Sequence, residues 1–374
     1  MSVPEIVAWQ ALLTDHQSHT FDALAAATGR RMRLKVGRTD DDIRRAQGWT
    51  FAAPKLLDIE PRDGGEAFQR DVVHLFGSPF EDVRQIMALA GIILRHQCAF
   101  LIAEPHAPPQ TSYFRQPGWR DRLRDVLRPA AYKAYALLLA RRISGVFAIS
   151  PRAVAQFRSM GVPPDCIFPF GYFVPSVGAR RLPHRQPGAP LRVVFIGALI
   201  ERKGLLELAA AARRLHDARC PIVIDVYGPG DPARFDLAGA RVNYRGPAAF
   251  GTAQVIFASY DLAVVPSRHD GWGVVVNEAL LAGTPVLCSA GVGASALIVK
   301  SGGGQVVAAN DSDALADALT NLASDAAKLD VMAAAASRFA PYLTPDVAGR
   351  YLLAAIASRL DGTSPPACPW YDMP

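Results

Sequence analysis

Short apolar segments alternate with helical stretches along most of the chain, and this alternation constrains the fold more than any other feature. Continuous apolar runs that end in glycine, such as residues 191–197, are typical of parallel strands covered by helices on both faces. Their repetition predicts doubly wound α/β domains. A chain of 374 residues with 50% hydrophobic residues is long and apolar enough for two such cores. In the first half we expect strands near residues 6–9, 32–36, 72–75, 99–103 and 145–149, and helices near 18–28, 80–96, 119–142 and 151–160.

The segment 264–286 combines an apolar strand, a glycine-containing turn and the start of a helix. A helix N-terminus beside a glycine turn presents backbone N–H groups to an anion, above all a phosphate. Asp270 in the turn and Glu278 about one turn into the helix can accept hydrogen bonds from the hydroxyls of two polyols. A phosphate between two polyols indicates a nucleotide sugar. The residues assigned to this site are Asp270, Gly271, Trp272, Gly273, Val274 and Glu278.

Basic residues follow the apolar run 191–197. Arg202 and Lys203 precede a predicted helix from 205 to about 216. Because α/β sheets bind ligands at the carboxyl ends of their strands, these two side chains are expected to contact a diphosphate. The runs 222–230 and 242–246 each end in a similar glycine turn, so their ends should lie along the same edge.

The segment 264–286 resembles the retaining glycosyltransferases of family four, within the glycosyl transferases group 1, which have the GT-B fold. Their signature is an acidic residue, seven further residues and a Glu, then Ala and a Gly-x-Pro-Val strand, and Asp270, Glu278, Ala279 and residues 283–286 match it. Asp270 stands where Glu is commoner. The family's Gly-Arg pair has Ala198 in place of Arg, so Arg202 either replaces that residue or faces solvent.

The resemblance implies two Rossmann-like domains that face each other across a cleft. Residues 1–175 would bind the acceptor, 176–190 would be a linker, and 191–340 would bind the nucleotide sugar. Residues 341–361 would form a helix that crosses back to the first domain, and the proline-rich tail 362–374 should be poorly ordered. The resemblance further implies that Gly228, Arg245 and Gly246 lie near the nucleotide and its base.

Candidate catalytic residues in the first half lie in two predicted loops. A polar loop after the first strand contains Asp15 and His16, and the loop after the fifth strand contains Glu104 and His106. In the family, a His in the later loop often lies near the transferred sugar. Together with Asp270, these residues are the predicted catalytic groups.

We predict that neither a metal nor another cofactor is required. Residues 40–42 have the Asp-x-Asp spacing that some glycosyltransferases use to bind a divalent cation. However, Thr39 and the following Ile-Arg-Arg indicate the capped, acidic start of a helix. A helix terminus and Lys203 can stabilise a diphosphate without metal.

Charge and cysteine content restrict the partners and the compartment. The net charge of +6 suits phosphate-bearing ligands or an anionic membrane, whereas nucleic acid binding would need a denser basic patch. Residues 115–142 form a basic amphipathic stretch that would either lie on anionic lipid or be an ordinary solvated helix face. Five widely spaced cysteines without a Cys-x-x-Cys pair, and no recognisable signal or spanning segment, predict a cytoplasmic protein, peripheral at most on the inner face of the membrane.

The resulting hypothesis is a retaining hexosyltransferase. It would use a UDP- or GDP-sugar and a saccharide or lipid-linked acceptor, in the assembly of a polysaccharide, a lipopolysaccharide or a glycolipid. Two alternatives remain open: a nucleotide-sugar epimerase of the same fold, and a catalytically silent scaffold in polysaccharide assembly.

Overall fold

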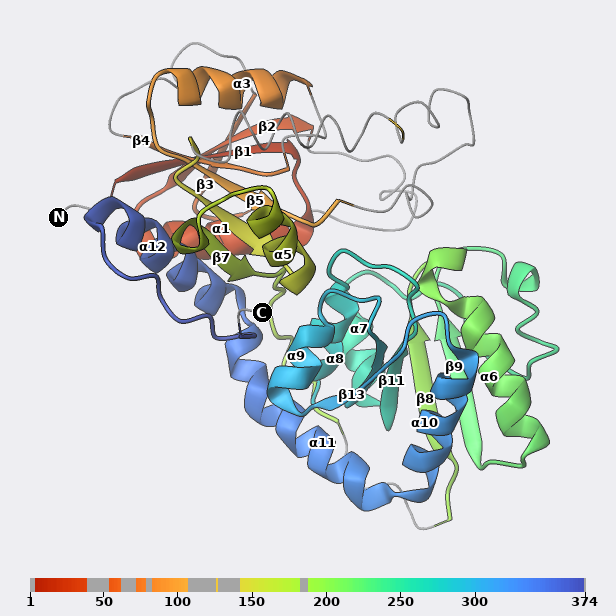
Figure 1. The fold of residues 1–374 in the computed structure, drawn as a ribbon. Coiled ribbons are helices and arrows are strands. Elements are labelled where there is room, and N and C mark those ends of the chain that lie inside the picture. The colour runs from red at the N-terminus through yellow and green to blue at the C-terminus, as the bar shows by residue number, and fades with distance from the viewer. Residues whose placement is uncertain are drawn as a thin grey trace. The chain divides into compact units, whose positions relative to one another are not determined.

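The chain forms two compact units in the computed structural model (Figure 1). Among the described residues, unit 1 extends to Tyr172 and also includes the chain from Pro345 onward, whereas unit 2 comprises Phe173–Thr344. The chain therefore passes from unit 1 to unit 2 and returns. The structure describes residues 4–38, 54–61, 72–78, 83–106, 126, 142–181 and 188–372.

Unit 1 contains a parallel sheet with the strand order β3-β2-β1-β4-β5-β6-β7. Helices α3 and α5 share a core with one face of this sheet, and α1 packs against α12 on the other side (Figure 1). The elements are β1 (Glu5–Leu12), α1 (Asp15–Thr28), β2 (Met32–Arg38), β3 (Leu57–Pro61), β4 (Val72–Phe76), α3 (Val83–Leu94), β5 (Ala99–Ala103), β6 (Gly145–Ile149), α5 (Pro151–Ser159), β7 (Ile167–Phe170) and α12 (Pro345–Asp361).

Unit 2 contains a second parallel sheet, with the order β10-β9-β8-β11-β12-β13. Its strands β8, β9 and β11 share a core with α6 and α10, while α7, α8 and α9 lie on the opposite side (Figure 1). The elements are β8 (Leu191–Ile196), α6 (Leu205–Asp217), β9 (Ile222–Tyr227), β10 (Asn243–Tyr244), α7 (Ala253–Ala258), β11 (Leu262–Val265), α8 (Val274–Leu281), β12 (Val286–Ser289), α9 (Ser295–Ser301), β13 (Gly304–Val307), α10 (Ser312–Ser324) and α11 (Ala326–Phe339).

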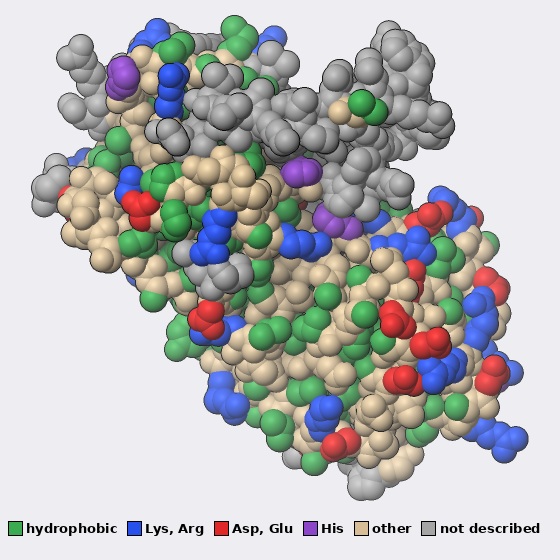
Figure 2. Space-filling model, in the orientation of Figure 1, with side chains coloured by type: hydrophobic (Ala, Val, Ile, Leu, Met, Phe, Trp, Pro, Cys, Tyr) green, Lys and Arg blue, Asp and Glu red, His purple; other side chains and the backbone are tan. Residues whose placement is uncertain are grey.

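The outer surface of unit 2 carries both signs of charge. Figure 2 shows Lys and Arg side chains interspersed with Asp and Glu over much of its visible face. Some form ion pairs between helices: Arg214 of α6 lies 3.1 Å from Asp313 and 2.7 Å from Asp317 of α10.

The predicted strands and helices are confirmed in the described residues, with two corrections. Helix α1 begins at Asp15, not near Ser18, because Thr14 caps it: the backbone N–H of Thr14 donates to Gln17 Oε1 at 3.1 Å. Three edge strands were not predicted from the apolar pattern: β3 and β7, which form the two edges of the sheet in unit 1, and β13, at one edge of the sheet in unit 2. The predicted helix at 119–142 lies almost entirely outside the described residues, as do Asp40–42.

The expectation of a poorly ordered tail is wrong. Trp370 and Tyr371 are buried, and Trp370 packs edge-on against Phe170. The Tyr371 hydroxyl lies within hydrogen-bonding distance of the Ala148 carbonyl and of the backbone N–H and carbonyl of Phe170. The tail thus packs on the carboxyl ends of β6 and β7. Burial of its two aromatic side chains outweighs the disorder expected from its proline-rich composition.

The described part of the chain contains no helix that is both long and apolar enough to cross a bilayer. All five cysteines lie in described residues, and none of them forms a disulfide.

Candidate functional site

The carboxyl edge of the sheet in unit 2 brings two loops together. Strands β8 and β11 are adjacent, although the chain places β9 and β10 between them. Strand order reverses at this point, and such a switch point is where doubly wound sheets bind ligands. The loop after β8 contains a 3₁₀ turn (Glu201–Lys203), and the loop after β11 contains Asp270.

Lys203 and Asp270 form an ion pair in this crevice. Lys203 Nζ donates to Asp270 Oδ2 at 2.5 Å, and the Arg202 guanidinium lies 3.8 Å from Asp270 Oδ1. All three side chains are at least four-fifths buried. Burial alone raises the pKa of the Asp270 carboxyl, but the positive charges of Lys203 and Arg202 outweigh it and hold this pKa below its ordinary value. Asp270 is therefore ionised at neutral pH.

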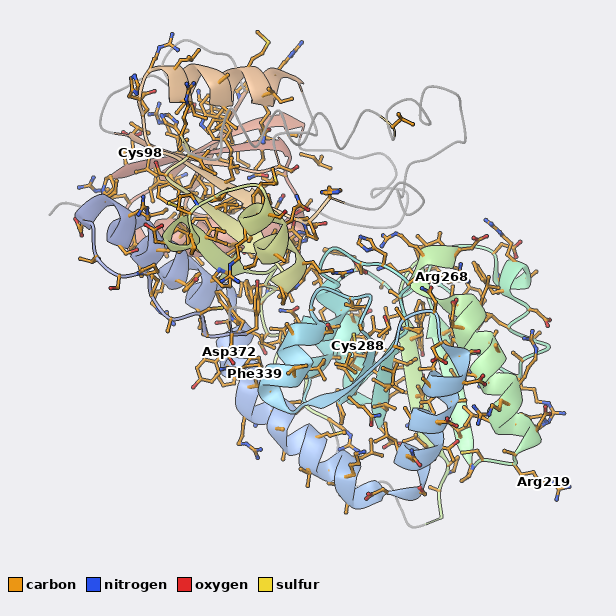
Figure 3. All side chains as sticks on the ribbon, in the orientation of Figure 1. Cys98, Arg219, Arg268, Cys288, Phe339 and Asp372 are labelled. Atoms are coloured by element: carbon orange, nitrogen blue, oxygen red, sulfur yellow. The ribbon has the colours of Figure 1, made fainter. Side chains whose placement is uncertain are left out.

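Close backbone packing holds the loop after β8 against the loop after β11. Gly204 has a φ of +78°, and a Cβ there would lie 2.0 Å from the Pro266 carbonyl oxygen. The backbone N–H of Arg268 donates to the Arg202 carbonyl at 2.8 Å. The Arg268 side chain, beside the first turn of α6 in Figure 3, donates to Glu207 Oε1 at 2.7 Å. These contacts fix Lys203 opposite Asp270.

The turn between Asp270 and α8 is held from its other side by the loop after β12. The N–H of Asp270 donates to the Gly291 carbonyl at 2.9 Å, and the N–H of Gly293 donates to the Asp270 carbonyl at 3.1 Å. Gly273 caps α8 with a φ of +93°, and a Cβ there would lie 2.7 Å from Val292 Cγ1. The position of the α8 N-terminus next to Asp270 therefore depends on glycine at 273.

The predicted residues of this turn have different roles in the structure. Gly271 lies in the turn and Val274 is the first residue of α8, and both are partly exposed. The Trp272 side chain is instead buried and donates from Nε1 to Asn277 Oδ1 at 2.9 Å, so only its backbone can contact a ligand. Glu278 lies in the second turn of α8 and is partly exposed.

Two more glycine turns lie along the same edge. The N–H of Gly228, after β9, donates to the carbonyl of Gly246, after β10, at 2.9 Å. The Arg245 side chain between them lies 3.2 Å from the buried Asp225 carboxylate. Sequence analysis did not identify Asp225, because its partners are distant in the chain.

Unit 1 places its candidate residues at the carboxyl ends of β1 and β5, two strands with β4 between them. Asp15 and His16 lie in the first turn of α1, not in a loop as expected. Asp15 pairs with His19 at 3.5 Å, and the His16 ring lies 4.3 Å from the ring of Tyr172. Tyr172 was missed because the preceding strand, β7, was not predicted.

Glu104 and His106 lie after β5, and both are exposed. The backbone N–H of His106 donates to the side-chain carbonyl of Gln156 in α5 at 3.0 Å, which holds this loop against α5.

Within the described ranges, no cluster of three or more His, Cys, Asp or Glu side chains is arranged to bind a metal ion. The three aspartates at 40–42 lie outside those ranges.

Residues 190–325 match the family model of the glycosyl transferases group 1, and this segment contains the whole sheet of unit 2. A curated relative, D-inositol 3-phosphate glycosyltransferase from Rhodococcus opacus (strain B4), is 30% identical over 168 residues, which are 43% of this chain and 32% of that protein. The chain thus spans about a third of the length of the curated relatives that it matches first.

Solved structures match over nearly the full chain. Anabaena HepE in complex with UDP aligns with a TM-score of 0.66 over 96% of this chain and 100% of that chain, at 16% identity. Sucrose-phosphate synthase from Thermosynechococcus elongatus aligns with a TM-score of 0.67 over 96% and 99% of the two chains, at 18% identity. The predicted α/β fold of GT-B type is confirmed, and so is the resemblance to the glycosyl transferases group 1.

Proposed function

From the group 1 match of residues 190–325 and the GT-B fold, we propose that this protein is a retaining glycosyltransferase of family four. It transfers a hexose from a UDP- or GDP-sugar to an acceptor hydroxyl. The observation that carries the proposal is the arrangement at the switch point of unit 2, where Lys203, Arg202 and the α8 N-terminus lie around Asp270.

The charges of this crevice suit a sugar diphosphate. The Lys203 ammonium has three N–H donors, so it can keep its bond to Asp270 and also donate to phosphate oxygens. The N-terminus of α8 adds partial positive charge. Arg202 takes the place of the arginine that Ala198 replaces, since its guanidinium already lies beside Asp270. Glu278 then binds the ribose hydroxyls, and Asp270 binds hydroxyls of the transferred sugar.

The reaction in this proposal is a direct transfer. The bond between the anomeric carbon and the diphosphate breaks while the acceptor oxygen bonds to the same carbon, and the acceptor proton passes to the leaving diphosphate. Lys203, Arg202 and the helix terminus stabilise the charge that develops on the leaving group. These fixed charges make a metal or other cofactor unnecessary, so we expect activity to persist in EDTA. Activity lost in EDTA and restored by added metal would contradict this.

The acceptor belongs to unit 1 in this proposal. Asp15 and His16 would contact the acceptor, and Glu104 and His106 are candidate catalytic residues of this unit. The acceptor is a saccharide or a lipid-linked saccharide, in the assembly of a polysaccharide, lipopolysaccharide or glycolipid. We place the enzyme in the cytoplasm, where the basic stretch 115–142 would contact the inner face of the membrane.

The first test is the thermal stability of the protein with UDP, GDP, ADP, CDP and dTDP. A ligand at a hundred times its Kd stabilises the folded state by about 2.7 kcal/mol, which gives a measurable shift in Tm. We expect UDP or GDP to raise the Tm, and Lys203→Gln to reduce this shift. If no nucleotide stabilises the protein, the proposal fails.

Product analysis with the sugar form of the stabilising nucleotide then separates the alternatives. A glycosylated acceptor, with the anomeric configuration of the donor, supports the transferase. An epimerised nucleotide sugar formed without acceptor would indicate the epimerase, and binding without any turnover would indicate the scaffold.

A further inference from the structure

Asp225 is a buried carboxylate that the proposed reaction does not use. It lies in β9 with a relative exposure of 4%. Its two oxygens accept hydrogen bonds from the Tyr260 hydroxyl at 2.6 Å and from Asn243 Nδ2 at 2.8 Å, and Arg245 Nη2 lies 3.2 Å away. Burial raises the pKa of the Asp225 carboxyl, but these three donors outweigh burial and lower it below its ordinary value. Asp225 is therefore a stable anion.

The three partners come from different parts of unit 2. Asn243 belongs to β10, Arg245 directly follows β10, and Tyr260 follows α7. Strand β10 has only two residues and lies at the edge of the sheet. So short a strand has few ladder hydrogen bonds, and its position depends on side-chain contacts. Asp225 supplies two such contacts and also ties β9 to the end of α7.

The residues that Asp225 fixes lead directly into two turns. β9 continues into Gly228 and β10 into Gly246, and the two glycines are joined by the hydrogen bond from Gly228 N–H to the Gly246 carbonyl. A Cβ at Gly228 would lie 1.8 Å from the Gly197 carbonyl oxygen, so this turn also packs closely on the end of β8. A shift of β10 would therefore move both turns at the crevice edge.

Tyr227 extends the network toward the turns. Its hydroxyl lies 3.3 Å from the Tyr260 hydroxyl, which itself binds Asp225. On the neighbouring strand, the Tyr244 hydroxyl donates to the Gly228 carbonyl at 2.9 Å. Side chains from β9 and β10 thus hold the turn at Gly228 from two directions.

We propose that Asp225 is a positioning residue for the nucleoside part of the donor. It holds the turns at Gly228 and Gly246, and the Arg245 side chain, in the arrangement that the base and ribose contact. This inference rests on the proposed donor site. Asp225 itself is buried and does not touch the ligand. The diphosphate is bound by Lys203 and α8, to which Asp225 makes no contact, so loss of Asp225 should affect the nucleoside and spare the diphosphate.

The test compares two ligands on one variant. Binding to wild type and Asp225→Asn is measured by calorimetry with the nucleoside diphosphate that stabilises the wild type, and with inorganic pyrophosphate. We expect the nucleotide Kd to rise about tenfold in Asp225→Asn, the equivalent of one charged hydrogen bond, with the pyrophosphate Kd unchanged. An unchanged nucleotide Kd, or an equal rise for both ligands, would overturn the inference.

Two further variants distinguish a loss of positioning from a general loss of folding. Tyr260→Phe removes a single hydroxyl and should give the same selective effect at smaller size, about threefold.

Asp261→Asn is the matched control: its side chain is 14% exposed and accepts from the backbone N–H of Arg192 at 2.9 Å, at the amino end of the sheet. It should leave both dissociation constants unchanged. Selective nucleotide loss in Asp261→Asn would also overturn the inference. A wild type that binds no nucleotide would refute the donor site itself, and this inference with it.

Discussion

Lys203 and Asp270 combine two roles that mutation can separate, namely stabilising the fold and binding the ligand. Lys203→Gln leaves the Asp270 carboxylate buried without its nearest cation, so we expect a loss of about 3 kcal/mol in the free energy of unfolding. Nucleotide affinity should fall at least tenfold, because a charged donor to phosphate is lost. Denaturant unfolding and calorimetric titration measure the two effects.

The double variant Lys203→Gln with Asp270→Asn is the control for that experiment. It removes both charges, so most of the lost stability should return while nucleotide affinity stays low. If affinity recovered together with stability, Lys203 would have only a structural role.

His74 makes unit 1 sensitive to acid. Its ring is fully buried in β4, Nδ1 accepts from Trp9 Nε1 at 3.2 Å, and Nε2 has no hydrogen-bond partner among the described residues. Burial, with a smaller effect of the Arg33 charge, lowers the pKa of His74 from 6.5 to about 4. The folded state therefore keeps His74 neutral where the unfolded chain already binds a proton.

Stability linked to His74 is fully present above pH 6.5 and is lost as the pH falls toward 4. The loss should reach about 3 kcal/mol. In His74→Gln, which keeps an acceptor for Trp9, the free energy of unfolding should depend less on pH between 7 and 4.5. Denaturant unfolding at these two pH values checks it, and equal pH dependence in both proteins would exclude His74 as the cause.

Helix α8 depends on its glycine cap for both stability and position. Gly273→Ala puts a side chain at a φ of +93°, where its Cβ would lie 2.7 Å from Val292. The left-handed backbone alone costs about 1 kcal/mol, and relief of the contact must shift either the Val292 side chain or the α8 N-terminus beside it. We expect a further loss of stability and a weaker Tm shift with nucleotide.

Gly302→Ala is the matched control for Gly273→Ala. Gly302 caps α9 with a φ of +69°, and a Cβ there would contact only Ala335 at an ordinary 3.8 Å. It should show the backbone cost of about 1 kcal/mol and an unchanged Tm shift with nucleotide. Equal effects of the two substitutions on the nucleotide shift would show that the α8 N-terminus does not bind the phosphate.

Most of the strands that sequence analysis identified lie inside a sheet, because a continuous apolar run such as residues 193–196 is a direct consequence of burial by helices. The three missed strands, β3, β7 and β13, are all edge strands. β3 contains two acidic residues, and β7 contains Pro169, which only an edge position tolerates. The spacing of Thr14 and Gln17, a capping pair, indicates the correct start of α1, but sequence analysis did not use it.

The candidate site likewise has one part that the sequence predicted and one part that it did not. The motif predicted Asp270, Lys203 and Glu278, since their residue types and spacing are local. Their arrangement was not predictable: Lys203 meets Asp270 only because Gly204 packs on the Pro266 carbonyl, a contact between residues far apart in the chain. The Asp225 network joins three such distant segments, so no local pattern reveals it.

Each unit has its own core, and the chain completes unit 1 only with its last residues. Helix α12 packs against α1, and the tail delivers the Tyr371 hydroxyl to backbone groups of β6 and β7. The candidate donor site, by contrast, lies entirely within unit 2. Changes in the tail should therefore affect the stability of unit 1 without affecting nucleotide binding.

Tyr371→Phe tests this separation. It leaves the backbone N–H of Phe170 and the carbonyl of Ala148 without the hydroxyl at 2.9 and 3.0 Å, in a buried position. Such a loss costs about 1 to 3 kcal/mol. In scanning calorimetry we expect one unfolding transition to move to lower temperature, and the nucleotide to raise the other transition as much as in wild type. If Tyr371→Phe instead weakened the nucleotide-dependent transition, the two units would be energetically coupled, and the assignment of nucleotide binding to unit 2 alone would fail.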